Sequence, residues 1–283
     1  MNKIRLGQVD YLNCYPVYYA IEHKQVPVHA KMVKGYPTKL NEMFLEGKLD
    51  ITPISSIEFA RNSDKAIILP NMSISADGDV QSILLFSKVP VTELDGLNVC
   101  LTSSSATSVA LLKILFEHYY QIQVRYTVQK PDLQQMLKKN DAALLIGDDA
   151  LLARHSDLDY EGRPLFVIDL GRAWRDFTGQ KMIYALWVIR SRFVEEHSAE
   201  IEAISKAFVD AKNFGFSHVS LLVDKAEQAT GLPRPVLESY FQTIQYEFGE
   251  DEQKALLTYY DYAYKSGLIN ERVKLNIWGE TIG

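Results

Sequence analysis

The sequence predicts an α/β protein with two lobes, and three observations support this fold class. Four apolar segments, at residues 4–9, 49–52, 97–102 and 142–146, each end in a polar loop that is followed by a helical pattern. The order of elements in the first 90 residues occurs a second time after residue 90, and a repeated half-size unit indicates two lobes that face a cleft. Beyond residue 190 the pattern is mostly helical.

The first unit alternates strands and helices, assigned from the spacing of its apolar residues. We expect its elements, in order, at residues 4–9 (strand), 16 onward (helix), 26–33 (strand), 37–47 (helix), 49–52 (strand), 57–60 (helix) and 80–86 (strand). Pro16 suits the first turn of a helix, and Gly47 marks a helix end.

The second unit repeats this order. We expect its elements at residues 97–102 (strand), 108 onward (helix), 123–128 (strand), 132–139 (helix), 142–146 (strand), 149 onward (helix) and 166–170 (strand). An apolar strand at 182–189 and helices at 195–214, 235–246 and 251–264 follow.

The chain is expected to leave the first lobe near residue 88 and to return to it near residue 187. Lobe I then comprises residues 1–88 and 187–283, and lobe II comprises residues 89–186. Two crossover strands between lobes, with a helical C-terminal segment, are the plan of a periplasmic-binding-protein-like fold of type II. Proteins with this plan close about the hinge and bury a ligand between the lobes.

Composition narrows the function classes. A formal net charge of −6 argues against a nucleic-acid groove, which needs clustered Lys and Arg. No apolar segment has the length of a secretory signal core or a membrane span, so we expect a cytoplasmic protein that does not contact membranes. Cys14 and Cys100 are expected to be reduced thiols. No spacing indicates a metal site or a cofactor, and the chain is open to being a monomer or a homodimer.

The polar loops predict where a ligand binds. In an α/β sheet such loops gather at the carboxyl ends of the strands, and the helices that follow present unpaired N–H groups with partial positive charge. Hydroxyl and amide side chains at several such positions favour a small carboxylated ligand. Asn13, at the end of the first strand, can bind a carbonyl or a carboxylate–hydroxyl pair, or instead cap the next helix.

Serine-rich loops form the next candidates. Of Ser55 and Ser56, one suffices as a helix cap, which leaves the other for the cleft. Ser82 lies on the strand that approaches the crossover. Five hydroxyls occur between residues 103 and 108, more than capping requires, without the glycines and lysine of a phosphate loop. This run favours carboxylate binding over a purely structural turn, and its candidate side chains are Ser104, Ser105, Thr107 and Ser108.

The loop after the strand at 142–146 offers a glycine and two acids. Gly147 allows close approach, Asp148 could accept a substrate hydroxyl or act as a base, and Asp149 is the expected helix cap. Capping alone explains the pair equally well. Aromatic side chains near the second crossover could wall a ring-sized ligand: Trp174, Tyr184 and Trp187.

Taken together, these segments resemble one family, the chorismate dehydratases of the futalosine route to menaquinone. The resemblance rests on residues 7–16, 49–56, 80–87, 104–108, 146–148, 169–171, 174, 178–179 and 187. It adds Thr178 to the substrate-binding candidates. The chain departs from the family at residues 180–182, where Gln-Lys-Met replaces Leu-Pro-Phe, which leaves open whether Lys181 reaches substrate.

The resemblance implies that the substrate is chorismate and that water is removed to give 3-[(1-carboxyvinyl)oxy]benzoate, without a cofactor. We assign one substrate carboxylate to the helix start at residues 103–108 and the other to Ser55 and Ser56. Asn13 and Ser82 are assigned to the ring hydroxyl or the ether. The proton acceptor is either Asp148 or a carboxylate of the substrate.

Three other functions fit the predicted fold, since fold alone does not decide function. A transport protein that binds small carboxylates is disfavoured by the missing signal segment. The sister enzyme that makes a dihydroxynaphthoate fits the start at residues 11–16 less well. A transcription-factor effector domain lacks a preceding helix-turn-helix.

Overall fold

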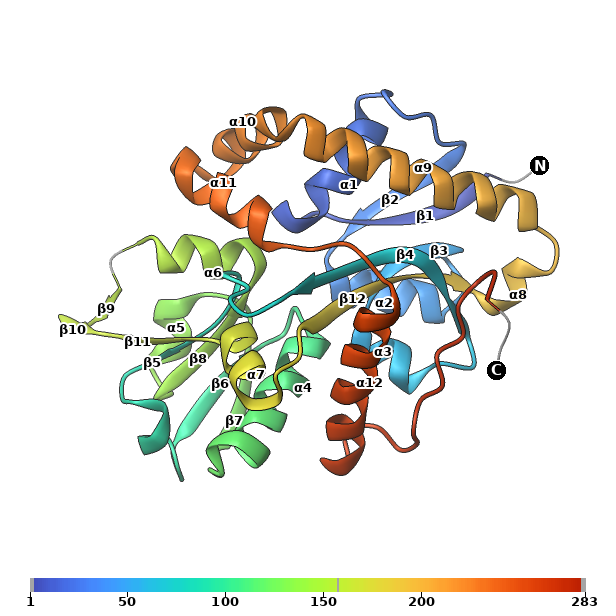
Figure 1. Cartoon of the computed structure of the whole chain (residues 1–283). Coiled ribbons are helices and arrows are strands. Elements are labelled where there is room, and N and C mark those ends of the chain that lie inside the picture. Colours follow the sequence, from blue (N-terminus) through green and yellow to red (C-terminus); the bar gives the residue numbers. More distant parts are fainter. Residues whose placement is uncertain (1–2, 157, 281–283) are drawn as a thin grey trace.

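Two five-stranded sheets lie side by side in the computed structural model, which describes residues 3–156 and 158–280 (Figure 1). In order across the first sheet, the strands are β2 (Ala30–Gly35), β1 (Ile4–Val9), β3 (Ile51–Ser55), β12 (Met182–Arg190) and β4 (Ala66–Ala76). Across the second they are β11 (Phe166–Asp169), β5 (Ile83–Ser87), β8 (Ala142–Ile146), β6 (Asn98–Thr102) and β7 (Arg125–Gln129). A short ribbon pairs β9 (Asp159–Tyr160) with β10 (Arg163–Pro164).

Both sheets are mixed. In the first, β1 is parallel to β2 and β3, while β12 runs antiparallel to β3 and β4. In the second, β6 is parallel to β7 and β8, while β5 runs antiparallel to β8 and β11. Strands β3 and β8 are buried at every residue, as expected of strands covered on both faces.

Helices cover both sheets. Those of the first unit are the 3-10 turn η1 (Leu12–Cys14), α1 (Tyr15–Glu22), α2 (Pro37–Leu45) and α3 (Ser56–Arg61). Those of the second are η2 (Val91–Glu93), α4 (Ala106–Ile114), its π-helical extension η3 (Leu115–Tyr120), α5 (Leu133–Leu137), α6 (Gly147–Arg154) and α7 (Leu170–Thr178). The C-terminal helices are α8 (Ser191–Val194), α9 (Ser198–Ser217), α10 (Val219–Thr230), α11 (Arg234–Thr243) and α12 (Glu250–Lys265).

The chain passes between the sheets twice, once from β4 to β5 and once from α7 to β12 (Figure 1). This arrangement confirms the predicted two-lobed α/β fold with two crossovers. Strand β5, which we placed in lobe I by setting the boundary at residue 88, pairs with β8 and β11 of the second sheet. We therefore propose that the first lobe boundary lies before β5, while the return near residue 187 falls within β12.

Other differences from the sequence prediction are local. The second strand is β2, at Ala30–Gly35 rather than 26–33, and the longest strand, β4, was not expected. Cys14 and Cys100 are buried free thiols. Among the described residues, none of the helices combines the length and the apolar character that crossing a bilayer requires.

Candidate functional site

A cavity of about 640 Å³, its open mouth included, is lined by residues from both sheets. The first sheet contributes the ends of β1, β3 and β4, the middle of β12, and the η1 turn. The second contributes the start of β5 and the loops that lead into α4 and α6. The described residues that line it carry no charged side chain.

Asn13 lines the cavity from the η1 turn. Its side-chain Oδ1 is buried and, in the described part of the chain, has no hydrogen-bond partner. The N-cap position of α1 belongs to Cys14, so the capping interpretation of Asn13 is wrong. The Tyr246 hydroxyl donates to the Asn13 backbone carbonyl at 2.7 Å and holds the turn in place. A buried amide oxygen without a partner costs free energy, which a ligand donor would offset.

Two tyrosines that line the cavity, Tyr11 and Tyr184, also have buried hydroxyls without a hydrogen-bond partner among the described residues. Burial raises the pKa of both phenols, although the nearby Ser104 hydroxyl acts in the opposite direction on Tyr11. Both hydroxyls therefore stay protonated at neutral pH and can donate to a ligand. The sequence indicates Tyr184 as a wall residue, whereas its pattern does not single out Tyr11.

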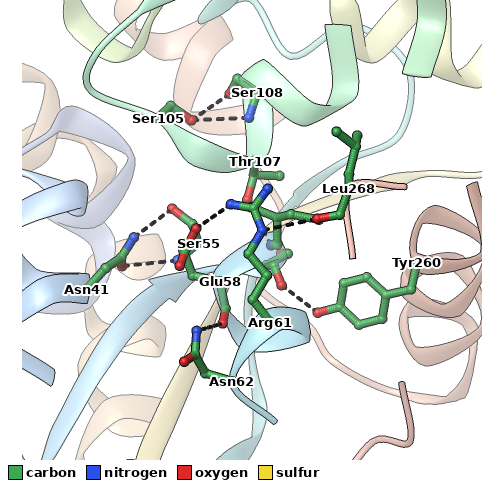
Figure 2. A network of polar contacts seen from close by, with 12 residues as sticks. Asn41, Ser55, Glu58, Arg61, Asn62, Ser105, Thr107, Ser108, Tyr260 and Leu268 are labelled. Carbon is green, nitrogen blue, oxygen red and sulfur yellow. Dashed lines mark hydrogen bonds and ion pairs between the residues drawn. The ribbon is translucent and has the colours of Figure 1, made fainter. Parts of the chain in front are cut away.

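The adjacent serines Ser55 and Ser56 lie in different surroundings. Ser55 lines the cavity, and its hydroxyl accepts from the Asn41 amide at 3.3 Å (Figure 2). Ser56 is fully buried, and its hydroxyl donates to the backbone carbonyl of Ile183 in β12 at 2.7 Å. Ser56, predicted to bind substrate, therefore does not line the cavity, and its hydroxyl proton joins α3 to β12.

The hydroxyl side chains between residues 103 and 108 fall into two groups, one that lines the cavity and one that does not. Ser105 is the N-cap of α4: its hydroxyl accepts from the Ser108 amide at 3.2 Å and donates to the Ser108 hydroxyl at 2.9 Å (Figure 2). Both of these serines line the cavity. Ser104 and Thr107 lie outside the lining. Ser104 shares a hydrogen bond with Thr102 at 2.6 Å, and the Thr107 hydroxyl accepts from the amide of Ile57 in α3 at 3.3 Å.

Ser82 lines the cavity at the start of β5. Its hydroxyl accepts from the Tyr240 hydroxyl of α11 at 3.1 Å, and its carbonyl accepts from the Gly147 amide at 2.7 Å. Gly147 lines the cavity beside it with a backbone φ of +60°. A Cβ at this position would lie 3.3 Å from the Tyr11 ring. The absence of a side chain at Gly147 thus makes room for the ring of a tyrosine from the other lobe.

Asp148 is half-buried and lies next to the cavity rather than in its lining. Its Oδ1 accepts from the backbone amide of Leu12 at 3.1 Å. Burial, helped by the charges of Asp149 and Asp10 and opposed by the Leu12 amide, raises the pKa of this carboxyl from 3.8 to about 7. Helix α6 has Ile146 at its N-cap, so the prediction that Asp149 is the cap is wrong.

Thr178 lies away from the cavity, at the end of α7, where its hydroxyl donates to the Trp174 carbonyl at 2.8 Å. Thr178, predicted to bind substrate, is therefore not one of the lining residues. Lys181 forms an ion pair with Glu252 and does not line the cavity. The indole N–H groups of Trp174 and Trp187 donate to the Lys181 carbonyl and the Tyr18 hydroxyl, so of the three aromatic wall candidates only Tyr184 borders the space.

The electrostatics of the cavity come from backbone dipoles. The N-cap residues of α1 and α4, Cys14 and Ser105, both line it, so two helix starts with partial positive charge meet the space. Within the described residues no cluster of three or more His, Cys, Asp or Glu side chains is placed to hold a metal ion. The arrangement can hold a small anionic ligand that carries additional oxygen atoms.

A two-lobed α/β fold with such a cavity between its sheets defines the periplasmic-binding-protein-like class. Similar solved structures include a protein from Archaeoglobus fulgidus (TM-score 0.79, 21% identity, covering 94% of this chain and 98% of that one). The periplasmic aliphatic sulphonate-binding protein SsuA from Escherichia coli is also similar (TM-score 0.69, 16% identity, covering 98% and 92%). These likenesses confirm the predicted fold class.

The sequence identifies the family within this class. Residues 4–265 match a family model described as menaquinone biosynthesis, and the chain belongs to this family. It is 26% identical over 261 residues to a chorismate dehydratase of Thermus thermophilus, covering 89% of this chain and 92% of the relative. It is 25% identical over 275 residues to a 1,4-dihydroxy-6-naphtoate synthase of the same organism, covering 95% and 96%.

Proposed function

We propose that this protein is a chorismate dehydratase, a carbon–oxygen lyase that converts chorismate to 3-[(1-carboxyvinyl)oxy]benzoate and water. One observation carries the proposal: an uncharged cavity lined by Tyr11, Asn13 and Tyr184, each of which has a buried polar atom with no hydrogen-bond partner among the described residues. A dicarboxylate with a ring hydroxyl and an ether oxygen supplies partners for all three. The membership of the menaquinone family and the similarity to a chorismate dehydratase support the same substrate.

The reaction needs positioning more than strong catalysts. The ring C–H bond breaks, its electron pair becomes the new ring double bond, and the neighbouring hydroxyl leaves with a proton as water. The product ring is aromatic, so the overall reaction is strongly downhill. The enzyme must exclude the rearrangement and the loss of pyruvate that compete for the same diene. A closed cavity that fixes both carboxylates does so by restricting the accessible geometries.

The lining residues suggest how chorismate is held. Ser105 and Ser108 at the start of α4 would bind one carboxylate, and Ser55 would bind the other. Asn13 and Ser82 would orient the ring hydroxyl and the ether oxygen, with Tyr11 and Tyr184 as additional donors. Hydrogen bonds in such a water-poor space are worth more than in solution.

The proton acceptor we propose is a carboxylate of the substrate itself. The cavity lining, within the described chain, contains no ionisable carboxyl, whereas chorismate brings two. A general base must come within hydrogen-bond reach of the proton it removes, and Asp148 is instead bonded to Leu12. Its carboxylate is therefore the weaker candidate for this role.

The test is to incubate the purified protein with chorismate and to follow the products by mass spectrometry and proton NMR. We expect loss of one water and a 1,3-disubstituted aromatic spin pattern. Asn13→Ala should abolish most of this conversion while leaving the circular dichroism spectrum unchanged, which excludes a contaminating activity. Chorismate that remains unchanged, or decays only to the products of the protein-free control, contradicts the proposal.

A second candidate function is that of the sister enzyme, because the 1,4-dihydroxy-6-naphtoate synthase is similar over almost the whole chain. The two candidates separate in one experiment in which chorismate and a cyclised futalosine derivative are supplied in equal amounts. Formation of a dihydroxynaphthoate from the second compound, with chorismate untouched, favours the sister function. Saturable binding of chorismate without turnover favours a binding protein instead.

A further inference from the structure

The lobes meet at a contact that the proposed chemistry does not use. The amide of Leu12, in η1 of the first lobe, donates to Oδ1 of Asp148 in α6 of the second, 136 residues later in the chain. The Tyr11 ring lies against Gly147 in the same place. Both contacts adjoin residues that line the cavity, since Asn13 follows Leu12 and Gly147 precedes Asp148. We call this contact the η1–α6 junction.

The surroundings of Asp148 are acidic or neutral. The charged groups acting on it are Asp149, on its own helix, and Asp10, in the loop after β1. The titratable side chains whose pKa the charge of Asp148 raises are Tyr11, Cys14 and Tyr15 from the first lobe's N-terminal segment and Tyr240 from α11. An ionised carboxylate at this junction is therefore poorly stabilised apart from its bond to Leu12.

We infer that Asp148 is a positioning residue: its hydrogen bond to the Leu12 amide latches the lobes together and holds the η1 turn, so that Asn13 faces the substrate. This inference rests on the proposed dehydratase function and assigns Asp148 a role within it. The carboxyl group acts through Leu12 and Asn13 and does not touch the reacting atoms. It needs an acceptor oxygen for this role, and it does not need a negative charge.

The latch makes substrate binding depend on pH in a direction opposite to that of a catalytic base. Burial in the closed protein raises the pKa of Asp148 to about 7, whereas an opened lobe hydrates it and returns the pKa towards 3.8. The closed form thus binds the proton more tightly. Closure is most favourable at low pH, weakens about tenfold per pH unit as the pH rises towards 7, and levels off above it. A base at the same position must be ionised, so turnover would increase over this range.

Three variants separate the two roles. Asp148→Asn keeps an acceptor oxygen and cannot ionise; we expect kcat to stay within about fivefold of wild type and KM to change less than about twofold between pH 5.5 and pH 8.5. Wild type should show a KM that rises about tenfold or more over the same interval. Asp149→Asn, the matched control, removes a neighbouring charge without touching Leu12 and should keep the rise. Asp148→Ala loses the acceptor and should raise KM at every pH.

A readout independent of catalysis tests the latch itself. Hydrogen exchange of the Leu12 amide, followed by NMR or on a short peptide that contains it, should be protected in wild type and Asp148→Asn with chorismate bound. It should be fast in Asp148→Ala. If wild type turns out not to dehydrate chorismate, the proposed function fails, and exchange in the unliganded protein alone still decides whether Asp148 holds Leu12.

Two results obtained with the variants would overturn the inference. One is a loss of more than about a hundredfold in kcat for Asp148→Asn with KM unchanged, the behaviour of a group needed only in the transition state. The other is Leu12 exchange that is equally protected in Asp148→Ala and wild type. A flat or falling wild-type KM across the pH range would also contradict the latch.

Discussion

Two of the junctions between the lobes are built differently. At each one a backbone amide of the first lobe donates to a side chain in the first turn of a second-lobe helix: Leu12 to Asp148 of α6 at 3.1 Å, and Ile57 to Thr107 of α4 at 3.3 Å. The acceptor is a titratable carboxyl at the first junction and a neutral hydroxyl at the second. We call the second contact the α3–α4 junction.

Helix α12 accounts for a further difference. The Tyr259 hydroxyl donates to the Thr107 carbonyl at 3.2 Å, and the Tyr260 hydroxyl donates to the Ser56 carbonyl at 2.8 Å. One helix therefore bonds to the starts of both α4 and α3, and Figure 2 shows Tyr260 and Thr107 converging on α3. All three side chains are buried. The comparison indicates a fixed joint at α3–α4 and a separable, pH-sensitive one at η1–α6.

The largest effect is expected at the residue that the separable junction positions. Asn13→Ala should lower kcat/KM for chorismate about a hundredfold or more, the usual cost of removing one well-placed polar group from a site that stabilises a transition state. Ser55→Ala, the corresponding lining residue beside the fixed junction, should cost less than about tenfold. Steady-state kinetics on both variants checks this, and equal losses would remove the distinction between the junctions.

Gly147→Ala should have the next largest effect. A φ of +60° is strained for alanine, and its Cβ would lie 3.3 Å from the Tyr11 ring, so we expect a loss of about 1–3 kcal/mol in the free energy of unfolding together with a higher KM. Gly162→Ala is the matched control: its φ is +75°, and among the described residues nothing lies within 4 Å of the added Cβ. It should lose stability and keep its KM. A KM shift in both variants would show that the Tyr11 contact is unimportant.

Thr107→Val should have the smallest effect, and on stability rather than on pH dependence. The substitution keeps the shape and removes the acceptor for the Ile57 amide, which leaves a buried donor unpaired. Because this bond is long, at 3.3 Å, we expect a loss of about 1 kcal/mol, measured by denaturant unfolding. Thr107→Ser retains the hydroxyl and should recover much of it. We also expect the KM of Thr107→Val to rise with pH as it does in wild type. Loss of that rise would show that the pH dependence arises at the α3–α4 junction and not at the η1–α6 junction.

The residue pattern was informative wherever the relevant contact is local. Polar loops at strand ends identified Asn13, Ser55, Ser82, Ser105, Ser108 and Gly147, all of which line the cavity. The excess of hydroxyls after β6 contained both an N-cap and its partner, because capping involves residues three apart in the chain.

Contacts between residues far apart in the chain determine the features that local sequence patterns do not predict. The Ser56 hydroxyl donates to the carbonyl of Ile183, 127 residues away, and does not face the cavity. No local sequence pattern predicts that acceptor. Strand β4 was missed because Pro70 and Asn71 interrupt it, with Asn71 at a φ of +60°. Its pairing with β12 jumps from Ile68 to Ser73 across two residues of the partner. An edge strand tolerates such a bulge, whereas the apolar pattern along the chain does not reveal it.

The position of β4 also bears on how the protein is made. Its backbone partners in the described chain lie in β12, at residues 245–246 and at residues 276–278, and all of them follow it in the sequence. The second sheet, from β5 to β11, is complete by Asp169 and can fold on the ribosome while these partners are still being synthesised. Domains generally fold as units during translation. When the second sheet has folded, the eleven-residue segment of β4 in the nascent chain therefore still lacks its hydrogen-bonding partners. We expect a chaperone to bind this segment first.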